Sequence, residues 1–119
     1  NRGLFENLSP EFFDDVKFLK KCSKFEPRCL QFAPENIRND FDFMLASVKR
    51  SWIVLQYCSP ELKDNYEIVY EAVSKNGMAL KNCGLGMRKE LEIVTVAVLQ
   101  NIGAIHFVDP SFKENQAFA

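Results

Sequence analysis

Histidine and tryptophan each occur once in the 119 residues, and glycine and proline occur five times each. So little glycine and proline argues against a flexible linker or a low-complexity chain. Apolar runs are short: none approaches the roughly 18 residues that a membrane-spanning helix requires. Residues 1–6 also lack the apolar centre of a secretory signal. We therefore expect a folded domain without a membrane partner.

Net charge is nearly absent as well. The chain has 15 basic and 16 acidic side chains and a formal charge of −1. Such a balance creates no overall field that would attract nucleic acid or an anionic lipid surface. We expect no nucleic-acid partner.

The sequence lacks the motifs that carry common enzymatic chemistry. It contains no phosphate-binding loop and no serine or cysteine nucleophile motif. Gly84-Leu85-Gly86 is not a dinucleotide-binding turn, because no strand pattern precedes it. His106 has no second histidine with which to bind a metal, and polar residues at its equivalent positions predict a surface location. We expect no catalytic residue, no metal site and no cofactor, and hence no enzyme.

The sequence does contain a repeat of 25 residues. One column of equivalent positions is aliphatic: Leu30, Leu55, Leu80 and Ile105. Other columns run in parallel, namely Phe18, Phe43, Ile68 and Ile93; Leu19, Met44, Val69 and Val94; Cys22, Ser47, Ala72 and Ala97; and Ile37, Leu62, Met87 and Phe112. Self-similarity at a fixed period of this length is the signature of a stacked repeat protein. The 11 phenylalanines suit the core of such a stack.

Each repeat unit is predicted to hold two helices. Apolar spacing predicts a first helix over 15–24, 40–50, 65–76 and 90–101, with an apolar stripe wide enough to contact neighbours on two sides. A shorter second helix is predicted over 27–32, 52–57, 78–82 and 103–107. A further single turn is predicted over 60–63.

Polar residues mark the starts of the first helices. Asp64 with Glu67 predicts a capping box in the third unit, and Asn39 with Asp42 predicts a similar one in the second. Asp14 offers a simpler cap to the first unit.

Proline and glycine mark the other boundaries. Ser59 precedes Pro60 and Asp109 precedes Pro110, an order typical of a cap followed by a first helical turn. Gly77 follows the long helix of the third unit, where a glycine indicates a left-handed helix end.

These patterns predict an all-α fold in which tandem 25-residue helix-turn-helix repeats stack as a short α-solenoid-like domain. Residues 1–119 then form a single repeat domain, with a partial unit at 1–14, units at about 15–39, 40–64, 65–89 and 90–114, and a tail at 115–119. The end units carry apolar residues that a neighbour would cover, so we expect a fragment of a longer array or self-association through exposed repeat ends. These residues are Leu4, Phe5, Leu8, Phe12, Phe13, Phe112 and Phe118.

Parts of the repeat resemble a known family. The relevant stretches are Tyr-Cys-Ser-Pro-Glu-Leu-Lys-Asp at 57–64, Glu-Ile-Val at 67–69, Ala-Val at 72–73 and Lys-Asn-Gly-Met-Ala-Leu at 75–80. They are similar to the repeat of the domain of unknown function 4116 family, best over residues 40–108. Glu26-Pro27-Arg28 departs from the Asn-Gly of that repeat, as does Asn101-Ile102-Gly103. The resemblance implies helical repeats in larger bacterial and protist proteins and carries over no catalytic residue.

The four cysteines are Cys22, Cys29, Cys58 and Cys83. They lack the close pairing, two to four residues apart, of common zinc ligands. Cys58 and Cys83 are equivalent positions of adjacent units, about 10 Å apart if the helices stack at ordinary distances, which is beyond disulfide reach. We predict buried free thiols, which favour a reducing, cytoplasmic compartment.

A column of basic residues would form a stripe along the stack, and such a stripe can follow phosphates. Its members are Arg38, Lys63, Arg88 and Lys113. An acid stands four residues after each of the first three: Asp42, Glu67 and Glu92. We therefore predict local ion pairs, each worth about a few tenths of a kcal/mol, and no phosphate binding.

Two surface features have alternative interpretations. Trp52 stands where the other units have Pro27, Gly77 and Ile102. It either packs in the core, which we favour, or anchors a partner. The outward residues of the second helices would form a ridge that contacts a protein, unless its aromatic residues fill grooves between helices. This ridge comprises Gln31, Phe32, Gln56, Tyr57, Lys81, Asn82, His106 and Phe107.

We expect a non-catalytic helical-repeat module that serves protein–protein interaction or scaffolding within a larger protein. The alternative is a structural or regulatory segment of a larger enzyme whose catalytic residues lie outside this fragment.

Overall fold

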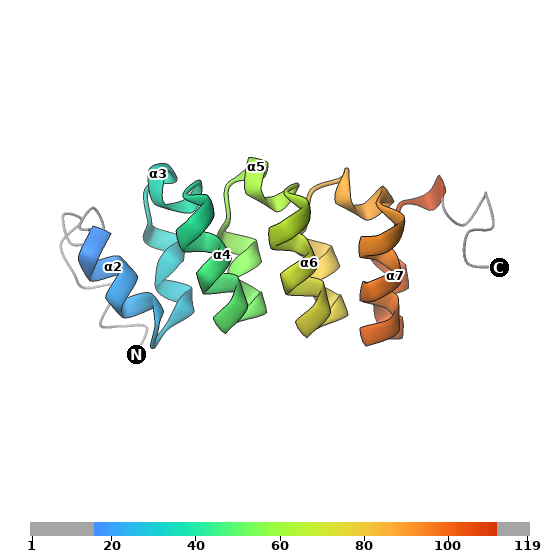
Figure 1. The fold of residues 1–119 in the computed structure, drawn as a ribbon, viewed down its shortest axis with the longest axis horizontal. Helices are drawn as coiled ribbons and strands as arrows, with labels where there is room; N and C mark the ends of the chain where they lie inside the picture. Colours follow the sequence, from blue (N-terminus) through green and yellow to red (C-terminus); the bar gives the residue numbers. More distant parts are fainter. Residues whose placement is uncertain (1–15, 112–119) are drawn as a thin grey trace.

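The computed structural model describes residues 16–111, and every regular element in this range is helical (Figure 1). The predictions for the partial unit 1–14, including Asp14, and for Phe112, Lys113 and the tail lie outside the described residues. Four long α-helices occur in this range: α2 (Val16–Ser23), α4 (Phe41–Arg50), α6 (Tyr66–Lys75) and α7 (Leu91–Gln100). The fold is therefore all-α, as predicted.

A short 3₁₀ helix (η) follows each long helix. These are η2 (Pro27–Phe32), η3 (Trp52–Tyr57), η4 (Gly77–Asn82) and η6 (Ile102–Phe107). A third, shorter turn forms the corner before the next unit: α3 (Glu35–Arg38), α5 (Pro60–Lys63) and η5 (Met87–Lys89).

The helices form two layers in an elongated body of 52 × 24 × 19 Å. The long helices follow one another along the body in chain order, with α4 against α6 and α6 against α7 (Figure 1). The 3₁₀ helices form the second layer, in which η2 contacts η3, η3 contacts η4 and η4 contacts η6. The core lies between the layers.

Most positions of the repeat columns predicted from the sequence lie in the core, whereas Phe18, Phe43, Met87 and Ile105 are half-buried. The column of Leu19, Met44, Val69 and Val94 has no exposed surface, and neither do Leu30, Leu55 and Leu80. The small-residue column is buried at Ser47, Ala72 and Ala97 and half-buried at Cys22. Trp52 is half-buried and packs against this core, as we favoured.

The predicted bounds of the long helices agree with the structure to within one residue at each end. The second helices also lie where expected, but they are 3₁₀ rather than α-helices. The start of a second helix has a local cause. A single extended residue, such as Asn76 with φ −156° and ψ 120°, ends the long helix and begins the next one. Its N–H donates to the Ala72 carbonyl, and its side-chain oxygen accepts from the Met78 N–H at 2.9 Å.

The predicted capping boxes are wrong by one residue. The side chain of Asn65, not Asp64, accepts from the first turn of α6, at 3.1 Å from the Ile68 nitrogen. Asp40, not Asn39, accepts from the Phe43 N–H at 3.1 Å in α4. The physical reason is that positions 39 and 64 end the preceding corner helix, so their side chains reach the next unit instead.

The caps predicted before proline do form. Ser59 Oγ accepts from the Leu62 N–H at 3.3 Å, at the start of α5. Asp109 accepts from the Ser111 N–H at 2.9 Å, and this bond lowers the pKa of the Asp109 carboxyl.

Gly77 does not have the left-handed backbone predicted for it, since no described glycine in 16–111 has a φ in that region. Its small size is needed for another reason. A Cβ at this position would lie 1.9 Å from the Ala97 carbonyl oxygen of the following unit. Glycine therefore permits close contact between η4 and α7.

Backbone hydrogen bonds join successive corners at the repeat period. The Ser59 N–H donates to the Arg38 carbonyl at 3.0 Å, the Gly84 N–H to the Lys63 carbonyl at 2.7 Å, and the Asp109 N–H to the Arg88 carbonyl at 3.1 Å. We call these three contacts the corner hydrogen bonds. Each connects the end of one corner helix to the end of the next 3₁₀ helix, so each fixes the position of one unit relative to its neighbour.

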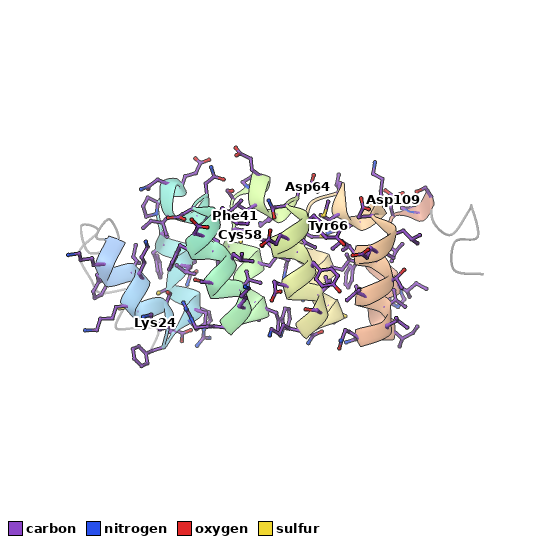
Figure 2. All side chains as sticks on the ribbon, in the orientation of Figure 1. Lys24, Phe41, Cys58, Asp64, Tyr66 and Asp109 are labelled. Carbon is purple, nitrogen blue, oxygen red and sulfur yellow. The ribbon has the colours of Figure 1, made fainter. Side chains whose placement is uncertain are left out.

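Side chains reinforce two of the corners. Ser59 Oγ donates to Asn39 Oδ1 at 2.6 Å. One corner later, Asp64 Oδ1 accepts from the Met87 N–H at 3.0 Å, and the carboxylate lies so close to Gly84 and Gly86 that a Cβ on either would approach it within 3.0 Å. Figure 2 shows Asp64 and Asp109 along the same edge of the body, where the corners lie.

Candidate interaction surface

The outward residues of the 3₁₀ helices divide into two groups. Exposed side chains occur in each of the four 3₁₀ helices that follow a long helix, at Gln31, Phe32, Gln56, Lys81 and His106. We call these five residues the η ridge. The other members of the predicted ridge, Tyr57, Asn82 and Phe107, are half-buried.

Tyr57 and Phe107 pack against the hydrophobic core. At these two positions the structure favours the alternative in which aromatic residues fill grooves between helices. What remains exposed is a polar row with one aromatic residue, Phe32, at 37% exposure. Because η2, η3, η4 and η6 contact one another in order, the η ridge follows the long axis of the body.

Arginines of the corner helices hold the backbone of the η ridge. Arg38 Nη2 donates to the Gln31 carbonyl at 2.6 Å, and Arg88 Nη2 donates to the Lys81 carbonyl at 2.7 Å, in the equivalent position two units later. These carbonyls lie near the C-terminal ends of 3₁₀ helices, where cations are favourable. The sequence did not predict this role for the basic column.

The ion pairs predicted for the basic column are wrong. In the described part of the chain the one salt bridge joins Arg28 and Glu26 at 2.7 Å, and no bridge joins the column to Asp42, Glu67 or Glu92. Hydrogen bonds from Arg28 hold the pKa of the Glu26 carboxyl at about 2. The prediction failed because the side chains of Arg38 and Arg88 extend back over the preceding 3₁₀ helix and not forward onto the following long helix. Glu92 instead accepts from the hydroxyl of Tyr66 in the preceding unit.

A cavity of about 410 Å³ lies beside the first two corners. Its charged lining residues are Arg38, Lys63 and Glu35, so the cationic side chains outnumber the acid. The remaining lining residues are Ala33, Cys58, Ser59 and Pro60. Its volume lies in the usual range of sites that hold a small ligand or an inserted side chain.

The thiols are buried, as predicted, at Cys29, Cys58 and Cys83, and all four cysteines, including the half-buried Cys22, are free. Burial raises the pKa of Cys29 and Cys58 to about 12 and that of Cys83 to about 11. Burial also raises the pKa of Cys22. Thiols of this kind are protonated at neutral pH and therefore poor nucleophiles.

Two other kinds of feature are absent from residues 16–111. This range contains no cluster of three or more His, Cys, Asp or Glu side chains that could hold a metal ion. None of its helices has the length and apolar character needed to span a membrane.

Comparison with known proteins gives one match. The family described as Domain of unknown function (DUF4116) matches three overlapping stretches, 15–63, 41–88 and 65–113. Each stretch covers about two units and begins about one unit after the last, in agreement with the repeat seen in the structure. No curated protein and no solved structure matches the chain. The matches cover most of the chain, which therefore belongs to the DUF4116 family.

Proposed function

We propose that this DUF4116 chain is a non-catalytic module that binds another protein along the η ridge, within a larger protein. The observation that carries the proposal is the alignment of exposed Gln31, Phe32, Gln56, Lys81 and His106 in one row along the body. Stacked repeats commonly bind partners through such extended surfaces. Polar side chains around an exposed aromatic residue are the usual composition of a protein–protein contact.

The backbone that supports the ridge is held in place before any partner arrives. Each 3₁₀ helix is closed at its C-terminal end by a backbone bond such as that from the Ala33 N–H to the Leu30 carbonyl, 3.1 Å long. Arg38 and Arg88 add side-chain bonds to the Gln31 and Lys81 carbonyls. Because little of this backbone must become ordered on binding, the entropic cost of association is reduced.

The cavity beside the first two corners suggests the kind of side chain that a partner would insert. Arg38 also holds the ridge at Gln31, so the cavity and the ridge adjoin. Two cations against Glu35 favour an acidic side chain there. We propose that the partner presents such a residue next to the contact with Phe32.

Site-specific photo-crosslinking tests the proposed surface. A photoreactive amino acid is placed at Gln56 or Lys81 on the η ridge and, as matched controls, at Asp42 or Glu67 on the exposed side of the long helices. Adducts with the same protein from both ridge positions, absent from both control positions, support the proposal. Equal yields from the two layers, or adducts only from the long helices, would refute it.

The same experiment distinguishes the alternative function. If the ridge positions link only to other parts of the parent polypeptide, the chain is a structural or regulatory segment of that protein. An adduct with a separate protein supports an interaction module.

We also propose a reducing compartment, such as the cytoplasm. Support comes from three buried thiols that occupy small apolar positions and remain unpaired. Mass spectrometry of the protein alkylated in intact cells tests this, and a disulfide among these thiols would contradict it.

A further inference from the structure

Three contacts identify which positions of a unit face the unit that follows. The Tyr66 hydroxyl in α6 donates to the Glu92 carboxylate in α7. Lys20 Nζ in α2 lies 5.1 Å from the ring centroid of Phe43 in α4. Gly77 at the start of η4 lies against the backbone of α7. Positions equivalent to Tyr66, Lys20 and Gly77 therefore form the forward face of a unit.

In the last described unit these positions carry residues with little to cover them. They are Leu91, Thr95 and Ile102, of which Leu91 is 53% exposed and Ile102 is 72% exposed. Leu91 begins α7 and Ile102 follows its end, so exposed apolar groups lie at both ends of this face. Large exposed apolar groups commonly mark a contact surface.

Two core columns give the same indication. Val48 and Val73 have no exposed surface, but the equivalent Val98 is only half-buried. Leu55 and Leu80 are fully buried, but the equivalent Ile105 is half-buried. Val98 and Ile105 are aliphatic like their equivalents, but no following unit buries them in the described structure. The surface that they form therefore has the composition of an interface between units.

The sequence beyond the described residues continues the repeat pattern. Asn115 stands 25 residues after Glu90, in the column of the helix-capping residues Asp40 and Asn65. Phe118 stands 25 residues after Ile93, in an apolar column that contacts the preceding unit at Phe43. These residues have the chemistry that the start of another long helix requires.

We propose that the forward face of α7 and η6, formed by Leu91, Thr95, Val98, Ile102 and Ile105, binds one further unit of the same 25-residue kind. The established interfaces between units extend directly onto this face. A second copy of the chain is the competing occupant. This proposal does not depend on the η ridge, which belongs to a different surface.

An extended chain tests the proposal. In the extended chain, residues 115–119 are replaced by a copy of residues 65–89. We choose this unit because it already packs after a unit that has a large residue, Trp52, at the position equivalent to Ile102. A matched control carries Ile68→Asp and Val69→Asp in the copied unit only. If that copy does not fold, a copy of residues 40–64 takes its place.

Hydrogen exchange of the Val94 and Ala97 amides in α7 is then compared among the three proteins. We expect exchange in the extended chain to be slower by about tenfold or more than in the 119-residue chain, because two large apolar side chains become covered. The control should match the 119-residue chain. Equal or faster exchange in the extended chain would overturn the proposal.

Sedimentation equilibrium of the unmodified chain tests the competing occupant. We expect a monomer, or an assembly that Ile102→Asp does not dissociate. A dimer that Ile102→Asp converts to a monomer would assign the face to a second copy and overturn the proposal.

Discussion

Replacing Gly77 with alanine tests the close packing of units most directly. The new Cβ would lie 1.9 Å from the Ala97 carbonyl oxygen and 2.8 Å from its carbon, and real Cβ atoms are essentially never found within 3.0 Å of such atoms. The obstructing atoms belong to the α7 backbone, so no side chain can rotate to make room. The start of η4 and α7 must move apart by about 1 Å.

The expected loss of stability follows from that displacement. Overpacking that forces a backbone shift costs about 1–3 kcal/mol. Removing a glycine from the unfolded chain offsets about 0.4–1 kcal/mol of this. We expect Gly77→Ala to lower the unfolding free energy by about 1–2 kcal/mol, which corresponds to a fall in Tm of about 4–16 °C for a domain near 100 residues.

Gly103 provides a matched control in the next unit. A Cβ there would meet the Asn101 side-chain oxygen at 3.1 Å and the Met78 sulfur at 3.6 Å, and the equivalent positions in other units carry Arg28, Ile53 and Met78. Gly103→Ala should therefore change stability by no more than about 0.5 kcal/mol. Urea denaturation followed by circular dichroism measures both variants. If Gly77→Ala is no less stable than Gly103→Ala, the close approach of η4 and α7 does not constrain this position.

Three further predictions concern the corners, the thiols and the aromatic residues. Asp64→Ala removes the acceptor for the Met87 N–H, so it should lower the unfolding free energy measured by urea denaturation by about 1 kcal/mol. The control Asp42→Ala should lower it by less than about 0.5 kcal/mol. Equal losses would show that the bond between units contributes nothing. Because burial raises the pKa of Cys83 from 9.0 to about 11, the folded chain retains a proton that the unfolded chain loses, so the unfolding free energy should fall from pH 9 to 11. Cys83→Ala should weaken that fall, and an unchanged pH dependence would argue against the buried thiol. Phe107→Ser should lower the unfolding free energy by about 2 kcal/mol, because the Phe107 ring packs on the core. Phe25→Ser, at a position that is 85% exposed, should lower it by less than about 0.5 kcal/mol. If Phe107→Ser leaves stability unchanged, Phe107 belongs to the contact surface and not to the core.

The parts of the fold that depend on local pattern could be predicted from the sequence. Burial of Leu30, Leu55 and Leu80 follows from their recurrence every 25 residues, because equivalent positions in stacked units have equivalent surroundings. The bounds of the long helices follow from capping residues and apolar spacing. The 3₁₀ form of the second helices was not predicted, since short apolar stretches have similar patterns in both kinds of helix.

Contacts between units were the part that sequence reasoning missed. Local rules assign the partner of Asp64 to its own helix, but the partner is Met87 in the following unit. A usable signal was present: Gly84 and Gly86 stand together in the corner that follows Asp64, and no other predicted corner contains two glycines. Similarly, Gly77 is the one glycine in a column that otherwise holds large or cyclic residues, which points to a steric requirement.

For the surface, the sequence predicted the exposed polar residues better than the aromatic ones. Gln31, Gln56, Lys81 and His106 are exposed as expected. Tyr57 and Phe107 occupy the same outward part of the 3₁₀ helices but pack partly against the core. Periodicity gives the direction of a side chain and not the depth of the groove beside it, so it could not separate these two outcomes.

The corner hydrogen bonds have a consequence for how such a chain can change in length. Donor and acceptor are both backbone groups, supplied by Ser59 and Arg38 at one corner and by Gly84 and Lys63 at the next. Almost any side chain is compatible with them, and proline is excluded only at the donor, a position that Ser59, Gly84 and Asp109 occupy in the three bonds. A 25-residue segment duplicated in register would therefore bring its own connectors to both neighbours. These backbone contacts therefore allow units to be gained or lost without matching substitutions, whereas a side-chain contact such as that of Asp64 with Gly84 and Gly86 requires them.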